Sequence, residues 1–401
     1  MTPWLAVIGI GEDGLAGLSP AARALLENAE VLVGGARHLA FAPEDGRVRL
    51  TWTRPLARLI EDILGHRGRR VAVLATGDPL HYGIAVTLAR HVPIREMTIL
   101  PAPSAFSLAG ARLGWPRTSV RCLTLHGRPL DLIQAEIQPG AKLLILSADG
   151  ATPKALARLL DQRGYGRSRI VVFEHMGGPK ERRIAGEAAT WHDQAIADFN
   201  TVAIECVADP GTPIFSRAPG LPDDAFRHDG QITKREMRAI TLSALRPVPG
   251  QLLWDVGAGC GSVSIEWLRC DPANRAIAIE RNPARLRLIA DNAAALGTPG
   301  LEIVAGEASA ALGDLTAPEA IFVGGGLARD GLMALCWDRL KPGGRLVANA
   351  VTLEGEAVLR DWRATTGGEM IRVGIERAEA LERFTGWRPL RAVTQLAAVK
   401  R

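Results

Sequence analysis

Short apolar runs alternate with longer amphipathic segments along this chain, most regularly in its second half. There the apolar runs predict strands at 251–256, 276–280, 301–304, 320–323 and 345–350. The segments between them carry apolar residues at helical spacing and predict helices at 263–270, 283–296 and 329–340. This alternation is typical of a doubly wound α/β sheet, in which ligands bind at the loops that follow the strands.

The first half of the chain also predicts an α/β domain, but its loops differ. Strands are expected at 4–8, 31–33, 71–75 and 98–100, and each ends in glycine, proline or other small residues. Ser19 precedes Pro20, so a helix is expected to begin there with Ser19 as its N-cap. Several such loops predict a ligand-binding cleft.

The densest cluster of breakers, four prolines and two glycines, spans 209–224. It predicts two domains, at 1–208 and 227–401, joined by a linker at 209–226. A helix is expected to begin just beyond the linker. Thr233 is the predicted N-cap, Glu236 completes a capping box, and Ile232 with Met237 forms a hydrophobic staple.

The composition agrees with two soluble domains and limits the classes of binding partner that are expected. The chain has 401 residues, of which 47% are hydrophobic and 23% charged. The net charge of +5 comes from dispersed arginines, which favours an anionic small molecule over nucleic acid. No apolar run reaches the roughly 20 residues of a membrane span, and Met1–Val7 lacks the basic region of a signal peptide, so a cytoplasmic protein is expected. The five cysteines and eight histidines show no metal-ligand spacing and no disulfide framework.

The most informative motif follows the strand at 251–256. It consists of Asp255 and three glycines, Gly257, Gly259 and Gly261, before the next helix, so bare backbone is able to approach a ligand. The strand at 276–279 ends in Glu280, which is placed to hold the hydroxyls of a ribose. Together they predict an adenosine-containing cofactor. The G-x-G-x-G spacing is that of S-adenosylmethionine (SAM) methyltransferases rather than the G-x-G-x-x-G of dinucleotide-binding domains.

Several motifs carry a resemblance to known families over essentially the whole chain. The first half contains Val7-Ile-Gly-Ile-Gly11, Thr76-Gly-Asp-Pro79, Pro101-Ala-Pro-Ser-Ala105 and Leu125-His-Gly-Arg128. It resembles the tetrapyrrole methylase family, and 31–39 is closest to the precorrin branch. Many members have a proline after the first glycines, where this chain has Glu12 and Asp13. The second half contains Gln231-Ile-Thr-Lys-Arg-Glu236, the glycine loop and Ile321-Phe-Val-Gly-Gly-Gly326, and resembles the CbiT-like Rossmann methyltransferases.

The resemblance implies a two-lobed tetrapyrrole methylase fold followed by a Rossmann-like SAM methyltransferase domain, with one SAM site in each. It further implies methylation of precorrin-6B at carbons 5 and 15 with loss of carbon dioxide from the carbon-12 acetate, giving precorrin-8X in cobalamin biosynthesis. The carbon-5 transfer falls to the N-terminal half and the rest to the C-terminal half. The expected partners are a tetrapyrrole polycarboxylate and further copies of this chain, with no nucleic acid, membrane or metal.

The matched motifs supply the candidate site residues. Candidate SAM contacts in the C-terminal half are Gln231, Thr233, Gly257, Gly259, Gly261, Glu280, Glu307, Ala308 and Gly324, and in the N-terminal half Gly9, Gly11, Gly77, Asp78, Pro79, Ser104 and Ala105. His81 and Arg128 are candidates for binding substrate carboxylates. Asn349, at a strand end, is the candidate catalytic residue, for substrate contact or proton handling.

Three other functions stay open on the sequence. The first is a SAM-dependent RNA or protein methyltransferase, because both halves have relatives that act on such substrates. The second is a nicotinamide-dependent oxidoreductase. The third is a SAM-binding regulator in which one half is inactive. The loop spacing and the intact glycine motifs in both halves disfavour the last two.

Overall fold

The computed structural model describes residues 3–53, 55–192 and 194–401, so the first two residues of the segment Met1–Val7 lie outside it. The chain divides into two compact units, 1–130 with 139–212 and 131–138 with 213–401. The division after residue 212 falls within the range of the expected linker. Residues 131–138 differ from the expected domain range because they pack on the second unit. Glu136 forms an ion pair with Arg217 at 2.7 Å, and Gln138 Nε2 donates to the Phe215 carbonyl at 2.8 Å.

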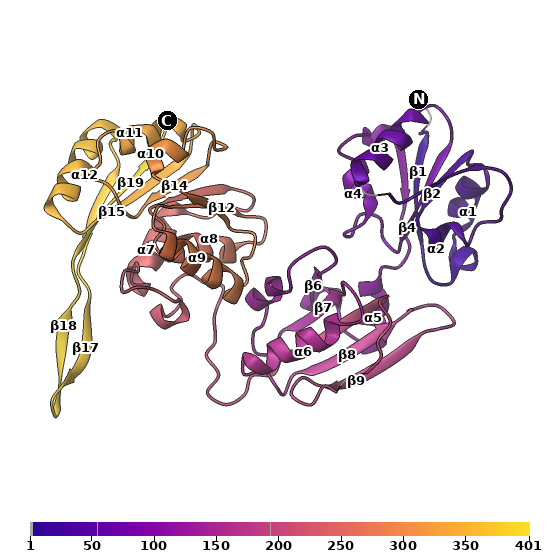
Figure 1. The fold of residues 1–401 in the computed structure, drawn as a ribbon, viewed down its shortest axis with the longest axis horizontal. Coiled ribbons are helices and arrows are strands. Elements are labelled where there is room, and N and C mark those ends of the chain that lie inside the picture. The colour runs from indigo at the N-terminus through magenta and orange to yellow at the C-terminus, as the bar shows by residue number, and fades with distance from the viewer. Residues whose placement is uncertain (1–2, 54, 193) are drawn as a thin grey trace. The chain divides into compact units, whose positions relative to one another are not determined.

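The first unit begins with a parallel sheet of five strands in the order β3-β2-β4-β1-β5 (Figure 1). Alternate residues of β1 belong to two different core clusters, Leu5 and Val7 to one and Ala6 and Ile8 to the other. Both faces of the sheet are therefore buried, as its apolar strands require. The elements are β1 (Leu5–Ile10), α1 (Pro20–Glu27), β2 (Val31–Gly34), α2 (Ala36–Leu39), β3 (Val48–Thr51), α3 (Leu56–Gly65), β4 (Val71–Thr76), α4 (Ile84–Leu88) and β5 (Met97–Leu100).

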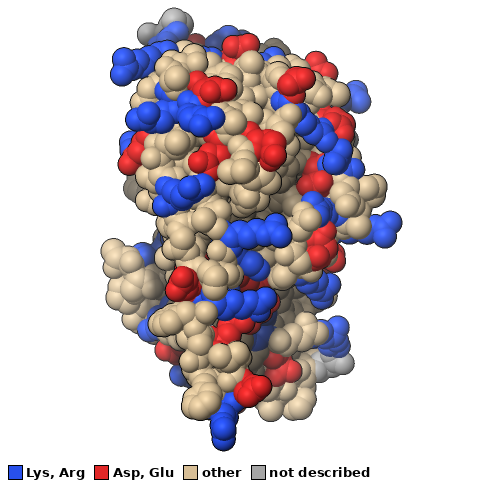
Figure 2. Space-filling view, turned by 90° about the vertical axis from the view of Figure 1, so that its left-hand side faces the viewer, with Lys and Arg blue, Asp and Glu red and all other residues tan. Residues whose placement is uncertain are grey.

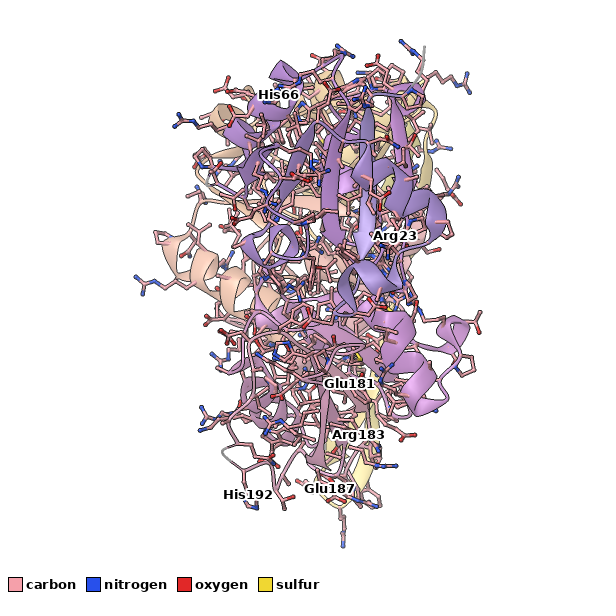
Figure 3. The ribbon with its side chains drawn as sticks, turned by 90° about the vertical axis from the view of Figure 1, so that its right-hand side faces the viewer. Arg23, His66, Glu181, Arg183, Glu187 and His192 are labelled. Atoms are coloured by element: carbon pink, nitrogen blue, oxygen red, sulfur yellow. The ribbon has the colours of Figure 1, made fainter. Side chains whose placement is uncertain are left out.

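A second sheet completes this unit, with strand order β6-β7-β10-β8-β9. Only β6 and β7 are parallel, and the other neighbours are antiparallel. Strand β9 lies at the edge, where the charged side chains of Arg183 and Glu187 (Figure 3) discourage pairing with another chain. The elements are α5 (Ala105–Leu113), β6 (Arg121–Thr124), β7 (Lys142–Leu146), α6 (Thr152–Gln162), β8 (Arg169–Glu174), β9 (Arg182–Glu187) and β10 (Asn200–Glu205).

The second unit is built on a seven-stranded sheet in the order β13-β12-β11-β14-β15-β19-β16. The first five strands are parallel, and β19 runs antiparallel to both neighbours. The elements are α7 (Arg235–Leu245), β11 (Leu252–Val256), α8 (Ser262–Cys270), β12 (Arg275–Glu280), α9 (Pro283–Ala295), β13 (Glu302–Ala305), α10 (Ala308–Ala311), β14 (Ala320–Val323), α11 (Leu332–Arg339), β15 (Arg345–Ala350), α12 (Leu353–Thr366), β16 (Glu369–Val373) and β19 (Val393–Val399).

A two-stranded ribbon, β17 (Glu376–Leu381) and β18 (Phe384–Pro389), extends from this unit between β16 and β19 (Figure 1). The sequence does not predict it, because its strands are mostly exposed and carry no apolar run. The residues at its base reach the functional cavity described below.

Of the two helix N-caps predicted from the sequence, one is confirmed and the other is wrong. Ser19 is the N-cap of α1 as predicted, and its hydroxyl accepts from the Ala22 N–H at 3.2 Å. Thr233 is not the N-cap of α7, so the predicted capping box is wrong. The helix begins at Arg235 with Lys234 at the cap position and no side-chain cap.

Three short 3-10 turns and two longer ones link these elements. They are η1 (Gly14–Gly17), η2 (Ile94–Glu96), η3 (Arg117–Ser119), η4 (Leu130–Ala135) and η5 (Asp223–Ala225). In the part of the chain that the structure describes, no helix has the length and apolar character needed to cross a membrane.

Candidate active sites

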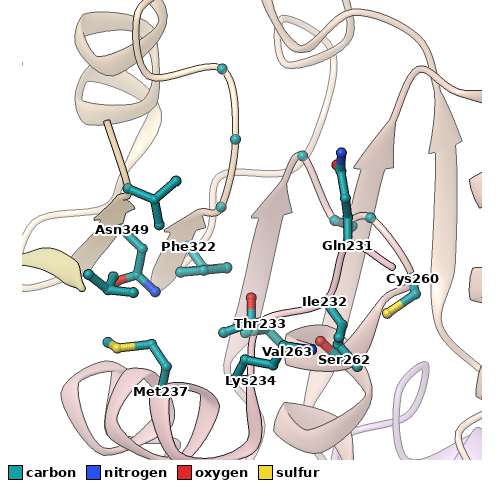
Figure 4. A pocket seen from close by; sticks show the side chains of 18 of the residues that line it. Gln231, Ile232, Thr233, Lys234, Met237, Cys260, Ser262, Val263, Phe322 and Asn349 are labelled. Atoms are coloured by element: carbon teal, nitrogen blue, oxygen red, sulfur yellow. The ribbon is translucent and has the colours of Figure 1, made fainter. Parts of the chain in front are cut away.

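A cavity of about 1190 Å³ lies in the second unit, beyond the carboxyl ends of the parallel strands (Figure 4). This is where open α/β sheets bind their ligands. It is lined by eight of the nine candidate SAM contacts expected in the C-terminal half, together with Asn349; the exception is Gly261. Its other lining residues include Lys234, Met237, Phe322, Arg377, Arg388 and Arg391.

The glycine loop forms one wall, and its backbone conformation requires glycine. Gly257, Gly259 and Gly261 have φ values of 74°, 62° and 79°. A Cβ on Gly257 would also lie 3.1 Å from the backbone nitrogen of Gly325, which belongs to the loop after β14. The two glycine loops therefore pack directly against each other and leave only backbone at this wall.

Glu280 is buried at the end of β12 and faces the glycine loop. Its Oε2 accepts from the Gly259 N–H at 2.9 Å, and its Oε1 accepts from the Arg281 and Asn282 N–H groups at 3.0 and 2.9 Å. These donors fix the carboxylate at the cavity wall. Oε2 accepts only one of these hydrogen bonds, so its second lone pair is still able to accept from a ligand hydroxyl.

Asp255 supports the loop from beneath. Its Oδ2 accepts from the Ser264 N–H at 3.0 Å and from the Ser264 hydroxyl at the start of α8, while Oδ1 has no partner among the described residues. Burial raises the pKa of Asp255 to about 6, against the lowering effect of the Ser264 hydrogen bonds. The residue joins the strand to the helix that the loop connects.

Glu307 and Ala308 line the cavity after β13. Glu307 is half exposed and pairs with Arg281 at 3.0 Å and with Arg329. Gly324 follows β14, and its N–H donates to the Val256 carbonyl at 3.0 Å, which holds the two loops together.

Gln231 and Thr233 belong to the segment that leads into α7, which we call the entry segment, and arginines hold this segment in place. Arg285 donates to the Gln231 side-chain oxygen at 2.6 Å, and the fully buried Arg238 donates to the Thr233 carbonyl. Glu236 pairs with Arg377 at 2.7 Å instead of folding back onto the cap. Burial alone would raise the pKa of Glu236, but the Arg377 and Arg235 guanidiniums and its backbone N–H lower it to about 2. Long-range ion pairs therefore override the local capping signal.

Asn349 belongs to a hydrogen-bond chain whose direction is set by the backbone. The Thr241 hydroxyl donates to the Met237 carbonyl at 2.8 Å, so its oxygen is left to accept. It accepts from Asn349 Nδ2 at 3.0 Å and from Gln395 Nε2 at 3.2 Å, and Gln395 Nε2 also donates to Asn349 Oδ1 at 2.8 Å. These hydrogen bonds hold Asn349 at the cavity, which Phe322 and Met237 also line (Figure 4).

Sequence reasoning missed Thr241 and Gln395, and also the cations that the ribbon contributes to the cavity. Thr241 and Gln395 carried no signal because they lie on a helix and on the last strand, far from any motif. The ribbon had a weak signal in the turn Glu382–Arg383 between two segments of alternating character.

The first unit brings its candidate glycines together in the same way. A Cβ on Gly9 would lie 2.0 Å from the Gly77 carbonyl oxygen and 2.4 Å from the Ala102 nitrogen, and a Cβ on Gly77 would lie 2.9 Å from Ser104 Cα. The loops after β1, β4 and β5 therefore meet as bare backbone. Gly11 follows in the first loop, while Pro79 continues the second.

Two polar residues of these loops already have structural partners. Asp78 Oδ1 accepts from the Leu80 N–H at 2.9 Å, which stabilises the turn. Ser104 is the N-cap of α5 and accepts from the Ser107 N–H at 3.2 Å, so Ala105 is the first residue of that helix. Two of the three candidate loops thus hold their polar side chains in local hydrogen bonds, one of them at the N-terminus of α5.

The two candidate substrate contacts of this unit flank Tyr82. The ring of His81 lies 4.6 Å from that of Phe106, and the Arg128 guanidinium lies 5.3 Å from the Tyr82 ring centroid. Burial and the nearby Arg117 lower the pKa of His81. The structure brings His81 and Arg128 into one aromatic and cationic cluster.

Surface charge shows no one-signed stripe on the face drawn in Figure 2, where Lys and Arg side chains are interspersed with Asp and Glu. This agrees with the dispersed arginines of the sequence and gives no support to an RNA-binding surface on that face.

Comparison with known proteins extends these observations. The model of tetrapyrrole (corrin/porphyrin) methylases matches residues 5–191, and the precorrin methyltransferase domain model matches 224–400. Both domains are thus of SAM-dependent methyltransferase families, and the predicted fold class is confirmed.

Three relatives cover different parts of the chain. A precorrin-6Y C(5,15)-methyltransferase [decarboxylating] of Sinorhizobium sp is 49% identical over 402 residues, covering 100% of this chain and 97% of the relative. A cobalt-precorrin-7 C(5)-methyltransferase of Salmonella typhimurium is 33% identical over 178 residues, or 44% of this chain and 88% of the relative. A probable cobalt-precorrin-6B C(15)-methyltransferase (decarboxylating) of Pyrobaculum aerophilum is 35% identical over 188 residues, or 45% and 95%. The chain belongs to the family of decarboxylating precorrin-6Y C(5,15)-methyltransferases and is a methyltransferase of cobalamin biosynthesis.

Proposed function

We propose that each domain has its own SAM site, and that the two sites divide the reaction. In this proposal the N-terminal domain methylates carbon 5. The C-terminal domain methylates carbon 15 and removes carbon dioxide from the carbon-12 acetate, giving precorrin-8X. The names of the two shorter relatives support the division, since one states a carbon-5 transfer and the other a decarboxylating carbon-15 transfer. One observation carries the proposal: the glycine loop, Glu280 and Asn349 line a single cavity.

The cavity fits a SAM molecule together with part of a larger substrate. Ligand pockets are typically about 300–1,000 Å³, and this one has about 1190 Å³. We assign its candidate SAM contacts to the wall formed by the glycine loop, Glu280 and the loops after β13 and β14. SAM supplies a methyl group that is already activated by its sulfonium.

The cavity lining also carries cations that suit a polycarboxylate substrate. They are Lys234 and three arginines from the ribbon and its base, Arg377, Arg388 and Arg391. Arg377 is paired with Glu236 and Arg388 with Glu379 at 2.9 Å, whereas Arg391 has no ion pair within the described part of the chain. We assign Arg391 to a substrate carboxylate. Arg391→Ala is expected to raise KM at least tenfold with kcat little changed, and Arg388→Ala, the matched control, to change KM less.

In this reaction the main task of the protein is to orient the reacting groups. A bridge carbon of a reduced tetrapyrrole is nucleophilic in the manner of an enamine, so the residues have to hold it in line with the methyl group and exclude water. Orientation of this kind supplies roughly 7–11 kcal/mol. Methylation at carbon 15 leaves a conjugated imine in the substrate that accepts the electron pair when carbon dioxide departs. The Asn349 amide then donates a hydrogen bond at the reacting centre.

Mass spectrometry of the reaction tests this proposal. Precorrin-6Y is incubated anaerobically with SAM and the full chain, as wild type or as Gly259→Arg, Gly77→Ala or the control Gly300→Arg. The exposed Gly300 has open space at its Cβ position and lies outside the cavity lining. Gly259→Arg is expected to remove one methyl transfer and the decarboxylation, and Gly77→Ala to remove only the other methyl transfer. If either variant loses both methyl groups, or neither, the division between the domains is wrong.

Self-association is part of the same proposal. Leu381, Phe384 and Trp387 of the ribbon are exposed large apolar side chains, which are characteristic of interaction surfaces when they cluster. Light scattering of the full chain, compared with Phe384→Ser, measures the oligomeric state. A monomer at micromolar concentration would contradict self-association.

A further inference from the structure

A cluster of polar side chains adjoins the glycine loops of the N-terminal domain and has no role in the proposal so far. Glu12 lies two residues beyond the end of β1. Its Oε2 lies 2.9 Å from His175 Nδ1, and its Oε1 accepts from Arg37. Arg37 also donates to the Thr76 hydroxyl at 2.9 Å. Thr76 ends β4 and directly precedes Gly77, so the cluster begins where the proposed SAM site ends.

The segment that carries His175 is built to approach Glu12. The His175 N–H donates to the Phe199 carbonyl at 3.2 Å, and the His175 carbonyl accepts from the Gly178 N–H at 3.0 Å. A Cβ on Gly178 would lie 2.7 Å from Glu12 Cβ, so glycine is needed for this approach. Glu181, labelled in Figure 3, accepts from the Gly177 N–H at 2.7 Å and holds the turn from its other side.

His175 itself has a φ of +46°, a left-handed conformation that is uncommon for residues other than glycine. Strained residues of this kind are found disproportionately at functional sites. Here the strain places the imidazole against the carboxylate instead of along the exit of strand β8.

The contacts determine which ring nitrogen carries the hydrogen. A carboxylate only accepts, so Nδ1 of His175 donates to Glu12 and the Nε2 lone pair remains available. Arg37 holds the other carboxylate oxygen and so keeps Glu12 in place. An acid that orients a histidine in this way is the arrangement used for general-base catalysis.

Carbon methylation creates a need for a base. A bond forms between the bridge carbon and the methyl group, and the bond between that methyl group and the SAM sulfur breaks, with the electron pair returning to sulfur. The product becomes neutral again only when one proton leaves its enamine-type nitrogen. The carbon-5 transfer, which is not followed by decarboxylation, thus releases one proton, and this proton needs an acceptor in the cleft.

We propose that His175, oriented by Glu12 and Arg37, accepts the proton released in the carbon-5 methylation. The inference rests on the proposed function of the N-terminal domain. His38, the other histidine of the cluster, is unsuited to this role. It is 7% exposed, its Nε2 contacts the Thr76 hydroxyl at 3.0 Å, and burial and Arg37 lower its pKa to about 4.

The test compares His175→Gln, Glu12→Gln and the control His66→Gln, which alters a partly exposed histidine in the same domain (Figure 3). Single-turnover methylation of precorrin-6Y by the full chain is followed by mass. His175→Gln is expected to slow the carbon-5 transfer roughly 10²–10⁴-fold. The carbon-15 transfer, the decarboxylation and the binding of two SAM molecules measured by calorimetry should be unchanged. Glu12→Gln should have a smaller effect in the same direction.

Two further readouts separate a base from a residue that is merely structural. Added imidazole should restore carbon-5 methylation in His175→Ala. The pH–rate profile of the carbon-5 transfer should show an inflection in wild type that His175→Gln lacks. The charged groups that face His175 are Glu12 after β1, Arg37 on α2 and the neighbouring Glu174 on β8, which is paired with Arg182 at 2.6 Å.

Each outcome bears on one claim. If His175→Gln keeps the carbon-5 rate within threefold of wild type, or loses a SAM site along with the rate, His175 is not the base. If Gly77→Ala leaves carbon-5 methylation intact, the proposed function of the domain fails, and the role of His175 fails with it.

Discussion

The buried arginine that anchors the entry segment provides the sharpest test of how the C-terminal cavity is held. Arg238 is fully buried and donates to Glu266 at 2.6 Å and to the carbonyls of Leu221 and Thr233. Glu266, also buried, accepts from the Gly220 and Leu221 N–H groups at 2.7 and 2.9 Å. The linker, helix α7 and helix α8 therefore meet at one ion pair.

Arg238→Met removes the cation and leaves Glu266 buried with only its two backbone donors. Removing one partner of a buried pair costs about 3–5 kcal/mol. A domain of this size loses roughly 2–4 °C in Tm per kcal/mol, so its unfolding transition should fall by roughly 6–20 °C. Because the Thr233 carbonyl also loses its donor, SAM binding to this domain should weaken.

The assay is urea unfolding of the full chain followed by hydrogen exchange of peptides from 213–401, which isolates this domain from the other. Arg235→Met is the matched control, because its ion pair with Glu236 is largely exposed and is worth at most about 1 kcal/mol. Adding Glu266→Gln to Arg238→Met should recover part of the loss, since no unpaired charge then remains buried. A loss below about 1 kcal/mol for Arg238→Met would refute the reasoning.

Two other predictions follow from the same domain. If Gln395 acts by orienting Asn349, Gln395→Leu should slow decarboxylation about tenfold in the wild-type background but have no further effect in Asn349→Leu. This double-mutant cycle is measured by mass spectrometry of the product, and equal effects in both backgrounds would contradict the coupling. Burial raises the pKa of Asp255 from 3.8 to about 6, so its contribution to stability is complete below pH 4 and is lost as the pH rises through 6. Asp255→Asn should therefore abolish a decline of about 2 kcal/mol in the unfolding free energy between pH 4 and 7, measured by urea titration at each pH. A decline of the same size in the variant would show that another group causes it.

The strands and helices around the glycine loops of the two domains were predictable because their signals are local. Apolar strands such as 252–256 and glycines with positive φ state their conformation in a few residues. The prediction of Thr233 as a cap failed for a complementary reason. Its signal was also local, but two arginines bind the groups of the expected capping box. Arg238, within the helix, donates to the Thr233 carbonyl, and Arg377, far beyond the helix, pairs with Glu236.

The candidate site divides along the same line. Gly257 and Glu280 were identifiable from spacing, because a loop and a strand end brought together by adjacent parallel strands need no distant information. Gln395 and His175 were not. Gln395 is 46 residues from Asn349 in sequence and reaches it through sheet pairing. His175 is 163 residues from Glu12 and reaches it through a turn.

The sequence by itself determined the two α/β domains, the backbone loops that suit SAM and, through resemblance, the family and its reaction. These follow from hydrophobic period and from the conformational freedom of glycine, which act over a few residues. Only the tertiary structure decided which polar groups meet: the Thr241 chain that orients Asn349, the ribbon that adds cations to the cavity, and the carboxylate that fixes His175. A hydrogen bond or an ion pair depends on distances of a few ångströms between segments far apart in the chain, and the packing of the whole domain sets those distances.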